Sequence, residues 1–334
     1  MNIFAISRLD KSIKLNSVQY IRIIAALSVI FFHIEQGINK KYWVMNEYLE
    51  LFSWGQKGVS LFFCISGFVI AYSSYIRPKK MFKFLYSRIA RIYPAYLFTA
   101  LIFIFSLIFL PNKNINPNEI LNTIFFNFGI SGGYVYVGWT LFYEMIFYTI
   151  FSTLSNNFKS IAKNQLFIYL ISIVLIFSYL TSSKYITDFA VGIVVFLIKL
   201  FPLKKYKSIV FLTLILSFVA GLFFNPLSFF LGITLIIILS FEEFLSPLFN
   251  AKFILFLADS SYAIYLAQVL TISASLKISR FITLNTFDNY YFMYLISFLI
   301  SIISTIYLGI LIRQYIEIPS FNFLKKISLT IWNY

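Results

Sequence analysis

The sequence predicts an all-α, polytopic integral membrane protein with about ten transmembrane helices. Its 334 residues are 60% hydrophobic and only 12% charged, and the mean hydropathy is +0.86. Soluble domains carry roughly 25% charged residues, so this composition excludes that class. The net charge of +15 comes from short basic segments between apolar runs, as in the loops of membrane proteins. We therefore expect membrane lipids as partners and no nucleic acid.

Ten apolar runs approach the roughly 20 residues that a helix needs to cross a bilayer. The sixth and eighth are short, so they can be tilted or partly interfacial. The ten runs are 17–36, 57–76, 90–111, 136–155, 165–183, 186–201, 208–224, 227–241, 254–276 and 290–316. No segment repeats, so we expect a single membrane domain over residues 1–334, with a short N-terminal segment (1–16) and a C-terminal tail (317–334).

The basic residues predict how these helices are oriented. If the loops alternate from a cytoplasmic N-terminus, 19 of the 27 Lys and Arg residues fall on the cytoplasmic side, seven on the other, and Arg22 within the first run. Short loops rich in Lys and Arg stay in the cytoplasm, so both termini are expected there.

Arg22 and His33 lie in the first apolar run, and His33 is the only histidine of the chain. Eleven residues complete about three helical turns, so both side chains share one face, roughly 16 Å apart along the axis. An ionisable residue in lipid is costly unless it faces protein or water. Histidine is also the commonest general base near neutral pH. We interpret His33 as a catalytic candidate; a structural, hydrogen-bonded histidine is the alternative.

The segment GWTLFYEMIFY, residues 138–148, carries Glu144 inside the fourth run. The expected depth of Glu144 is similar to that of His33, so the two side chains can meet. A carboxylate can orient an imidazole and stabilise its protonated form. The alternative is a glutamate paired with Arg or Lys for structure.

A basic segment, RPKKMFKFLYSRIARIYPAY (77–96), leads into the third run. Arg88 and Arg91 are three residues apart and share a helical face, where guanidinium groups suit phosphate oxygens. Together with Arg22 near the same surface they indicate an anionic ligand from the cytoplasm. Polybasic loops that only fix topology or contact anionic lipid are the alternative.

The ninth run contains a polar stripe within ADSSYAIYLAQ, residues 258–268. Ser261, Tyr265 and Gln268 follow one another at spacings of four and three residues, which places them along one side of a helix; Asp259, Ser260 and Tyr262 lie in the same run. Such a stripe either joins helices by hydrogen bonds or lines a cavity. The single cysteine, Cys64, permits no internal disulfide and no CxxC site, and we expect no metal cofactor.

Six motifs, in this order and spacing, resemble those of acyltransferase family 3, the bacterial membrane O-acyltransferases. They are Arg22-x10-His33, GVSLFFCISGFVIA (58–71), SRIARIYPAY (87–96), GWTLFYEMIFY, DSSYAIYLAQ and YIEIP (315–319). The resemblance covers nearly the whole chain. It implies about ten spans in the bacterial cytoplasmic (inner) membrane. It also implies transfer of an acetyl group from cytoplasmic acetyl-CoA, the co-substrate, to a hydroxyl of a glycan or glycolipid, such as lipopolysaccharide or capsule.

The resemblance also implies roles for particular residues. His33 matches the family's essential histidine, Arg22 its paired arginine, and Arg88 and Arg91 its Arg-x-x-Arg motif for acyl-CoA. Ser66 belongs to the Ser-Gly-Phe signature, in which Gly67 is expected to let helices approach closely. Further residues support the motifs or the cavity; they are Trp139, Tyr148, Tyr262 and Tyr265.

Two positions depart from the family pattern. Ser60 stands where many members have an acidic residue, and Gln268 stands where many have a second histidine. A mechanism with two histidines therefore cannot operate. His33 is expected either to take a proton from the acceptor hydroxyl or to carry the acetyl group transiently. The rival interpretation is a transporter or flippase that uses Arg22, His33 and Glu144 as a substrate or proton path.

Overall fold

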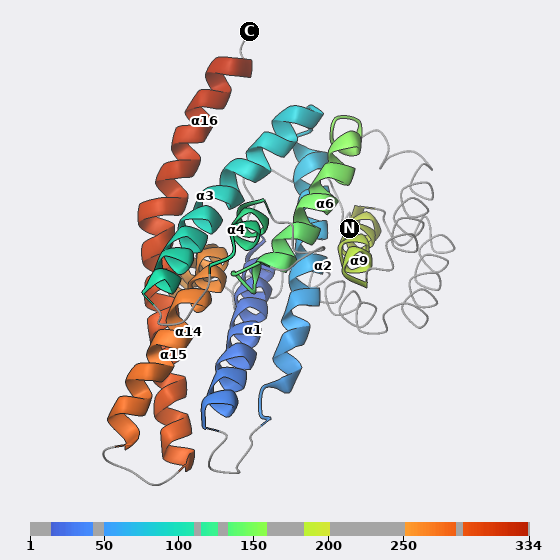
Figure 1. Cartoon of the computed structure of the whole chain (residues 1–334). Coiled ribbons are helices and arrows are strands. Elements are labelled where there is room, and N and C mark those ends of the chain that lie inside the picture. The colour runs from blue at the N-terminus through green and yellow to red at the C-terminus, as the bar shows by residue number, and fades with distance from the viewer. Residues whose placement is uncertain are drawn as a thin grey trace. The chain divides into compact units, whose positions relative to one another are not determined.

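A computed structural model describes residues 15–42, 50–109, 115–125, 133–158, 184–200, 251–284 and 290–332. Within these ranges every regular element is a helix (Figure 1). Four helices are long and apolar enough to cross a membrane, and a bent pair, residues 252–259 and 261–282, is a fifth candidate. The predicted runs 165–183, 208–224 and 227–241 lie outside the described residues. The number of ten spans and the cytoplasmic termini therefore stay predictions.

In chain order, the described helices are α1 (Asn16–Tyr42), the 3₁₀ turn η3 (Ser53–Lys57), α2 (Gly58–Ile76), α3 (Met81–Ile108), α4 (Pro117–Ile124), α6 (Gly138–Ser155), α9 (Lys184–Leu200), α13 (Lys252–Asp259), α14 (Ser261–Leu284), α15 (Tyr290–Ile312), the π-helical turn η4 (Arg313–Glu317) and α16 (Ile318–Trp332).

The chain forms two compact units, each assembled from three segments. Unit 1 comprises Met1–Ile23, Val59–Phe84 and Phe147–Ala258, and unit 2 comprises Ile24–Gly58, Leu85–Ile146 and Asp259–Tyr334. Several helices therefore contribute to both units, because the unit boundaries fall inside α1, α3 and α6.

In unit 1, two glycines allow α2 and α9 to pack backbone against backbone. A Cβ atom at Gly67 would overlap the carbonyl oxygen of Phe189, and a Cβ at Gly192 would overlap that of Cys64. Small residues permit this close approach between apolar helices. The ring of Phe189 fills the adjoining space and stacks on Phe147 with ring centroids 4.2 Å apart. The structure thus gives Gly67, in the Ser-Gly-Phe signature, the packing role expected of it.

In unit 2, α14 and α15 lie side by side and run antiparallel (Figure 1). Three pairs of buried hydroxyl groups join them, and we call these pairs the hydroxyl ladder. The pairs are Thr271 with Thr305 at 2.6 Å, Ser275 with Ser301 at 2.8 Å and Ser279 with Ser297 at 2.9 Å. Each step of four residues along α14 matches a step of four backwards along α15, so the ladder follows one face of both helices.

Helical structure extends beyond the predicted apolar runs in several places. α3 begins at Met81, nine residues before the predicted run, so Arg88 and Arg91 lie within a helix. Within the predicted C-terminal tail the chain is helical, as α16, to Trp332. The π-helical turn η4 ends two residues before Pro319, and the N–H of Ile318, the residue between them, donates to the Arg313 carbonyl. A wider turn accommodates a residue that lacks an N–H and crowds the preceding turn.

Candidate active site

The polar side chains of α14 contact three other helices of unit 2. The Tyr262 hydroxyl donates to the Ile92 carbonyl of α3 at 2.8 Å. The Tyr265 hydroxyl lies 3.2 Å from Thr140 Oγ1 of α6, and Gln268 Oε1 lies 2.9 Å from His33 Nδ1 of α1. From Tyr262 to Gln268 the stripe extends roughly 9 Å along the helix axis. Hydrogen bonds along α14 therefore join this helix to α1, α3 and α6.

His33 is held from two directions. Its ring meets the ring of Tyr136 edge to face, with centroids 5.1 Å apart and an interplanar angle of 81°. Its Nδ1 faces the carbonyl oxygen of Gln268, which only accepts hydrogen bonds, so Nδ1 carries the proton and donates. In the neutral ring Nε2 then has the free lone pair, as a general base requires.

Gln268 is fully buried. Its Oε1 is occupied by His33, whereas its Nε2 has no hydrogen-bond partner among the described residues. Buried polar groups in native proteins are normally paired, so an unpaired amide nitrogen requires an explanation. Sequence reasoning noted Gln268 as a departure from the family pattern and as part of the stripe, but assigned it no role beside His33.

Arg88 and Arg91 are both half-buried on α3. Ile92, whose carbonyl accepts from Tyr262, directly follows Arg91. The residue that follows the Arg-x-x-Arg segment is therefore hydrogen-bonded to Tyr262, near the start of α14, and His33 is hydrogen-bonded to Gln268, further along the same helix. The structure brings these sequence-predicted residues into one set of connected helices within unit 2.

Glu144 and Trp139 are half-buried on α6. Glu144 lies near enough to the Tyr265 hydroxyl for an electrostatic interaction, and the Trp139 ring packs edge to face on Tyr143. At Nδ1, the His33 ring donates its hydrogen bond to Gln268 Oε1 and not to Glu144. The catalytic role expected of Glu144 remains a proposal.

Three predicted residues belong to unit 1. The Arg22 guanidinium lies over the Phe62 ring, 5.8 Å from its centroid, a distance at which a cation and an aromatic face attract. Ser66 is half-buried on α2 beside Gly67. Tyr148 is buried, and its ring meets Phe84 edge to face at 6.3 Å.

Glu35, two residues after His33, was missed by the sequence reasoning. It is buried, and its carboxylate accepts hydrogen bonds from the Leu51 and Phe52 amides at 2.8 and 2.9 Å and from the Tyr294 hydroxyl at 3.0 Å. These bonds fix the chain that enters η3 against α1. An acidic residue inside the apolar run was the available signal, but its position near the end of the run indicated the membrane interface.

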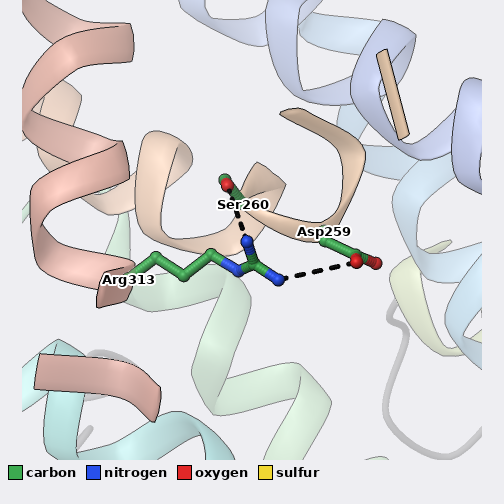
Figure 2. A network of polar contacts seen from close by, with 3 residues as sticks. All are labelled: Asp259, Ser260 and Arg313. Carbon is green, nitrogen blue, oxygen red and sulfur yellow. Dashed lines mark hydrogen bonds and ion pairs between the residues drawn. The ribbon is translucent and has the colours of Figure 1, made fainter. Parts of the chain in front are cut away.

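Arg313 was also missed. Its guanidinium reaches the break between α13 and α14, where it lies 3.5 Å from the Asp259 carboxylate and donates to Ser260 Oγ at 3.4 Å (Figure 2). The helices bend by 66° at this break. The interactions of Arg313 thus connect η4, which contains the first three residues of the YIEIP motif, with the start of α14.

Comparison with known proteins identifies the family. Within the described ranges no group of three or more His, Cys, Asp and Glu side chains could hold a metal ion. No curated protein and no solved structure matches the chain significantly. The family model described as "Acyltransferase domain" matches residues 15–314, which include five of the six motifs; the sixth, YIEIP, begins at the next residue. On the strength of that match, the chain belongs to acyltransferase family 3, the membrane acyltransferases, as its motifs predicted.

Proposed function

We propose that this protein transfers an acetyl group from cytoplasmic acetyl-CoA to a hydroxyl group of a polysaccharide or glycolipid precursor of the bacterial cell envelope. The observation that carries the proposal is the environment of His33. The chain's only histidine is held at Nδ1 by Gln268 on the α14 stripe, and that stripe also contacts the Arg-x-x-Arg helix. A base and a phosphate-binding segment are thereby connected in a protein of an acyltransferase family.

The acyl donor would extend along α14. Arg88 and Arg91 suit the phosphates of CoA, because guanidinium groups bind phosphate oxygens in bidentate geometry; Arg22 is proposed to assist them. The thioester end then lies toward His33, which α14 places roughly 9 Å further along its axis than Tyr262.

The proposed reaction needs one base and one oxyanion site. The acceptor oxygen attacks the thioester carbonyl carbon while its proton passes to His33 Nε2. The carbon–sulfur bond then breaks, and the imidazolium returns the proton to sulfur, so that an ester and CoA thiol leave. Glu144, from α6, is proposed to stabilise the charged imidazolium.

The test uses purified protein and acetyl-CoA radiolabelled in the acetyl group, with water or envelope glycans as acceptors. We expect wild type to release or transfer label and His33→Ala to lose at least about a hundredfold in rate, the usual contribution of a positioned base. Arg88→Ala should raise the KM for acetyl-CoA, because it removes a phosphate contact, with a smaller change in kcat.

A variant on the hydroxyl ladder, Ser275→Ala, serves as the control for general damage to the helix bundle. It should bind and turn over acetyl-CoA as wild type does. Turnover that persists in a folded His33→Ala protein would refute the proposed base. A folded wild type with neither acetyl-CoA binding nor turnover would instead favour a transport function.

A further inference from the structure

The chain that follows α3 folds back along this helix. The Tyr96 hydroxyl donates to the Thr123 carbonyl of α4 at 2.7 Å, and the Tyr93 hydroxyl donates to the Ile124 carbonyl at 3.3 Å, so the end of α4 lies beside α3 (Figure 1). Tyr96 is near the middle of α3, roughly 18 Å along the axis from the end of the helix at Ile108. Because α3 is long and apolar enough to cross a membrane, α4 ends at the depth of the span and not at its surface.

Residues 133–137, which precede α6, form no regular helix and lie at the same depth. The Tyr134 N–H donates to Thr123 Oγ1 at 2.8 Å, and the Val137 carbonyl accepts from the Tyr265 hydroxyl of α14 at 3.4 Å. The segment is thereby fixed to α4 at one end and to α14 at the other. Irregular backbone occurs at membrane depth only where protein buries it or where it lines a water-filled cavity.

Tyr136 is the most exposed residue of this segment. Val135 and Val137 are fully buried, whereas 43% of the surface of Tyr136 is exposed. Its ring contacts His33, which is itself partly exposed, and its hydroxyl makes no hydrogen bond within the part of the chain that the structure describes. A phenolic hydroxyl that faced lipid hydrocarbon without a partner would be unfavourable. Water or a polar ligand next to His33 explains this exposed surface.

We propose that Tyr136 binds the acceptor of the acyl transfer, in a water-filled approach to His33 that residues 133–137 line. Its hydroxyl forms a hydrogen bond with a hydroxyl group of an acceptor sugar, and its ring packs against the C–H groups of that sugar. The inference rests on the proposed acyl transfer and adds the residue that recognises the acceptor.

The chemistry of Tyr136 suits a sugar. Tyrosine combines a large apolar ring with a polar hydroxyl, and a sugar ring likewise has C–H groups and hydroxyls. The ring centroids of Tyr136 and His33 are 5.1 Å apart, and both rings have exposed surface. A sugar that covers the exposed part of Tyr136 therefore lies beside the imidazole, where one of its hydroxyls can meet the proposed base.

The first experiment asks whether Tyr136 faces water or lipid. Cys64, the only cysteine of the chain, is buried, so Cys64→Ala gives a background without thiols. Tyr136→Cys is introduced into this background, with Leu101→Cys of α3 as the matched control, because 50% of the surface of Leu101 is exposed. The thiolate is the form that reacts, and apolar surroundings suppress it. A charged thiol reagent therefore distinguishes the two environments.

In protein embedded in lipid nanodiscs, we expect the charged reagent to modify Tyr136→Cys and to leave Leu101→Cys unmodified. An unmodified Tyr136→Cys protein that is folded would overturn the water-filled approach. Equal rates at the two positions would also overturn it, because exposure to water would then not distinguish the segment beside His33 from the surface of α3.

The second experiment measures recognition of the acceptor, with radiolabelled acetyl-CoA and envelope glycans. Tyr136→Phe keeps the ring beside His33 and removes the hydroxyl. It should raise the KM for the glycan about fivefold, as expected for one lost neutral hydrogen bond, and leave the KM for acetyl-CoA unchanged. Tyr136→Ala, which also removes the ring, should raise the glycan KM further. Tyr307→Phe, at an exposed position of α15, is the control and should change neither KM.

An unchanged glycan KM in a folded Tyr136→Ala protein would refute the acceptor role. If wild type transfers acetyl groups to no glycan, the proposed function and the acceptor role both fail. The labelling result is independent of turnover and decides separately whether Tyr136 faces water.

Discussion

The two halves of α14 use buried polar groups in different ways. From Thr271 to Ser279 each hydroxyl of the ladder bonds both to a carbonyl of its own helix and to a hydroxyl of α15. From Ser261 to Gln268 the side chains contact α1, α3 and α6, and two buried polar atoms remain without partners among the described residues. The same helix thus has one fully paired half and one partly paired half.

This difference distinguishes polar side chains that hold helices together from polar side chains that are available to a ligand. Paired hydroxyls between helices hold the helices together, each at a modest energy. Unpaired buried donors do not stabilise the fold, and they are retained where a ligand supplies the missing partner. We call the part of α14 from Ser261 to Gln268 the site half and the part from Thr271 to Ser279 the ladder half. Substitutions in the ladder half should therefore change stability, whereas substitutions in the site half should change turnover.

The largest effect is expected from a substitution that separates α14 from α15, because it disturbs both halves of α14 at once. Gly309 of α15 packs against Ile264 of α14, and a Cβ atom there would lie 2.5 Å from Ile264 Cα. Gly309→Val should force the two helices apart and cost about 3 kcal/mol, the upper end of the usual range for overpacking, with loss of both stability and turnover. The midpoint of thermal unfolding in detergent measures the first, and acetyl-CoA turnover the second. Tyr307→Ala, at an exposed neighbouring position, is the control; an unfolding midpoint of Gly309→Val equal to that of wild type would contradict the close packing.

Glu35 extends the comparison to α1, where its fully paired carboxylate lies two residues from His33, the proposed base. Glu35→Ala leaves the Leu51 and Phe52 amides and the Tyr294 hydroxyl without their acceptor. We expect a loss of about 2–3 kcal/mol in stability and little change in turnover per folded molecule. Gln36→Ala, at an exposed position, is the control. A loss of turnover with unchanged stability would instead place Glu35 in the catalytic site.

Much of the fold and part of the site could be predicted from the sequence. Apolar run lengths predicted both ends of α2 to within one residue and the start of α1 to within one, whereas α1 and α3 extend six and nine residues beyond their predicted runs. Helical spacing put Ser261, Tyr265 and Gln268 on one stripe, because the helical period is a local property. The hydroxyl ladder was also visible as hydroxyl residues four apart in two successive runs, although we attached no contact to it.

The decisive contact could not be predicted. His33 and Gln268 are 235 positions apart, and spacing within each helix does not say which faces meet across helices. The sequence favoured Glu144 as the partner of His33 because both were expected at similar depth. The depth of a residue does not determine how its helix is rotated about its own axis. In unit 2, the rotations of α1 and α14 place Gln268 beside Nδ1 of His33.

A smaller effect is expected from Tyr265→Phe, in the site half. It removes the hydroxyl that bonds Thr140 and so loosens the contact between α14 and the start of α6, beside Tyr136 and His33. We expect turnover to fall about tenfold, equivalent to about 1.4 kcal/mol, with a small shift in the unfolding midpoint. Thr271→Val, which removes a hydroxyl from the ladder half, should show the reverse pattern. Equal effects of the two variants on turnover would erase the distinction between the halves.

The smallest expected effect lies within the ladder. Ser275→Ala should reduce stability by about 0.6 kcal/mol, the average for a hydrogen bond between membrane helices, without a change in kcat. Because Ser301 is then left without the Ser275 hydroxyl, the double variant Ser275→Ala/Ser301→Ala should cost less than the sum of the two single variants. A double-mutant cycle of unfolding midpoints measures this coupling. Strict additivity would show that the two hydroxyls do not interact, and the ladder would then contribute shape rather than hydrogen bonding to the α14–α15 pair.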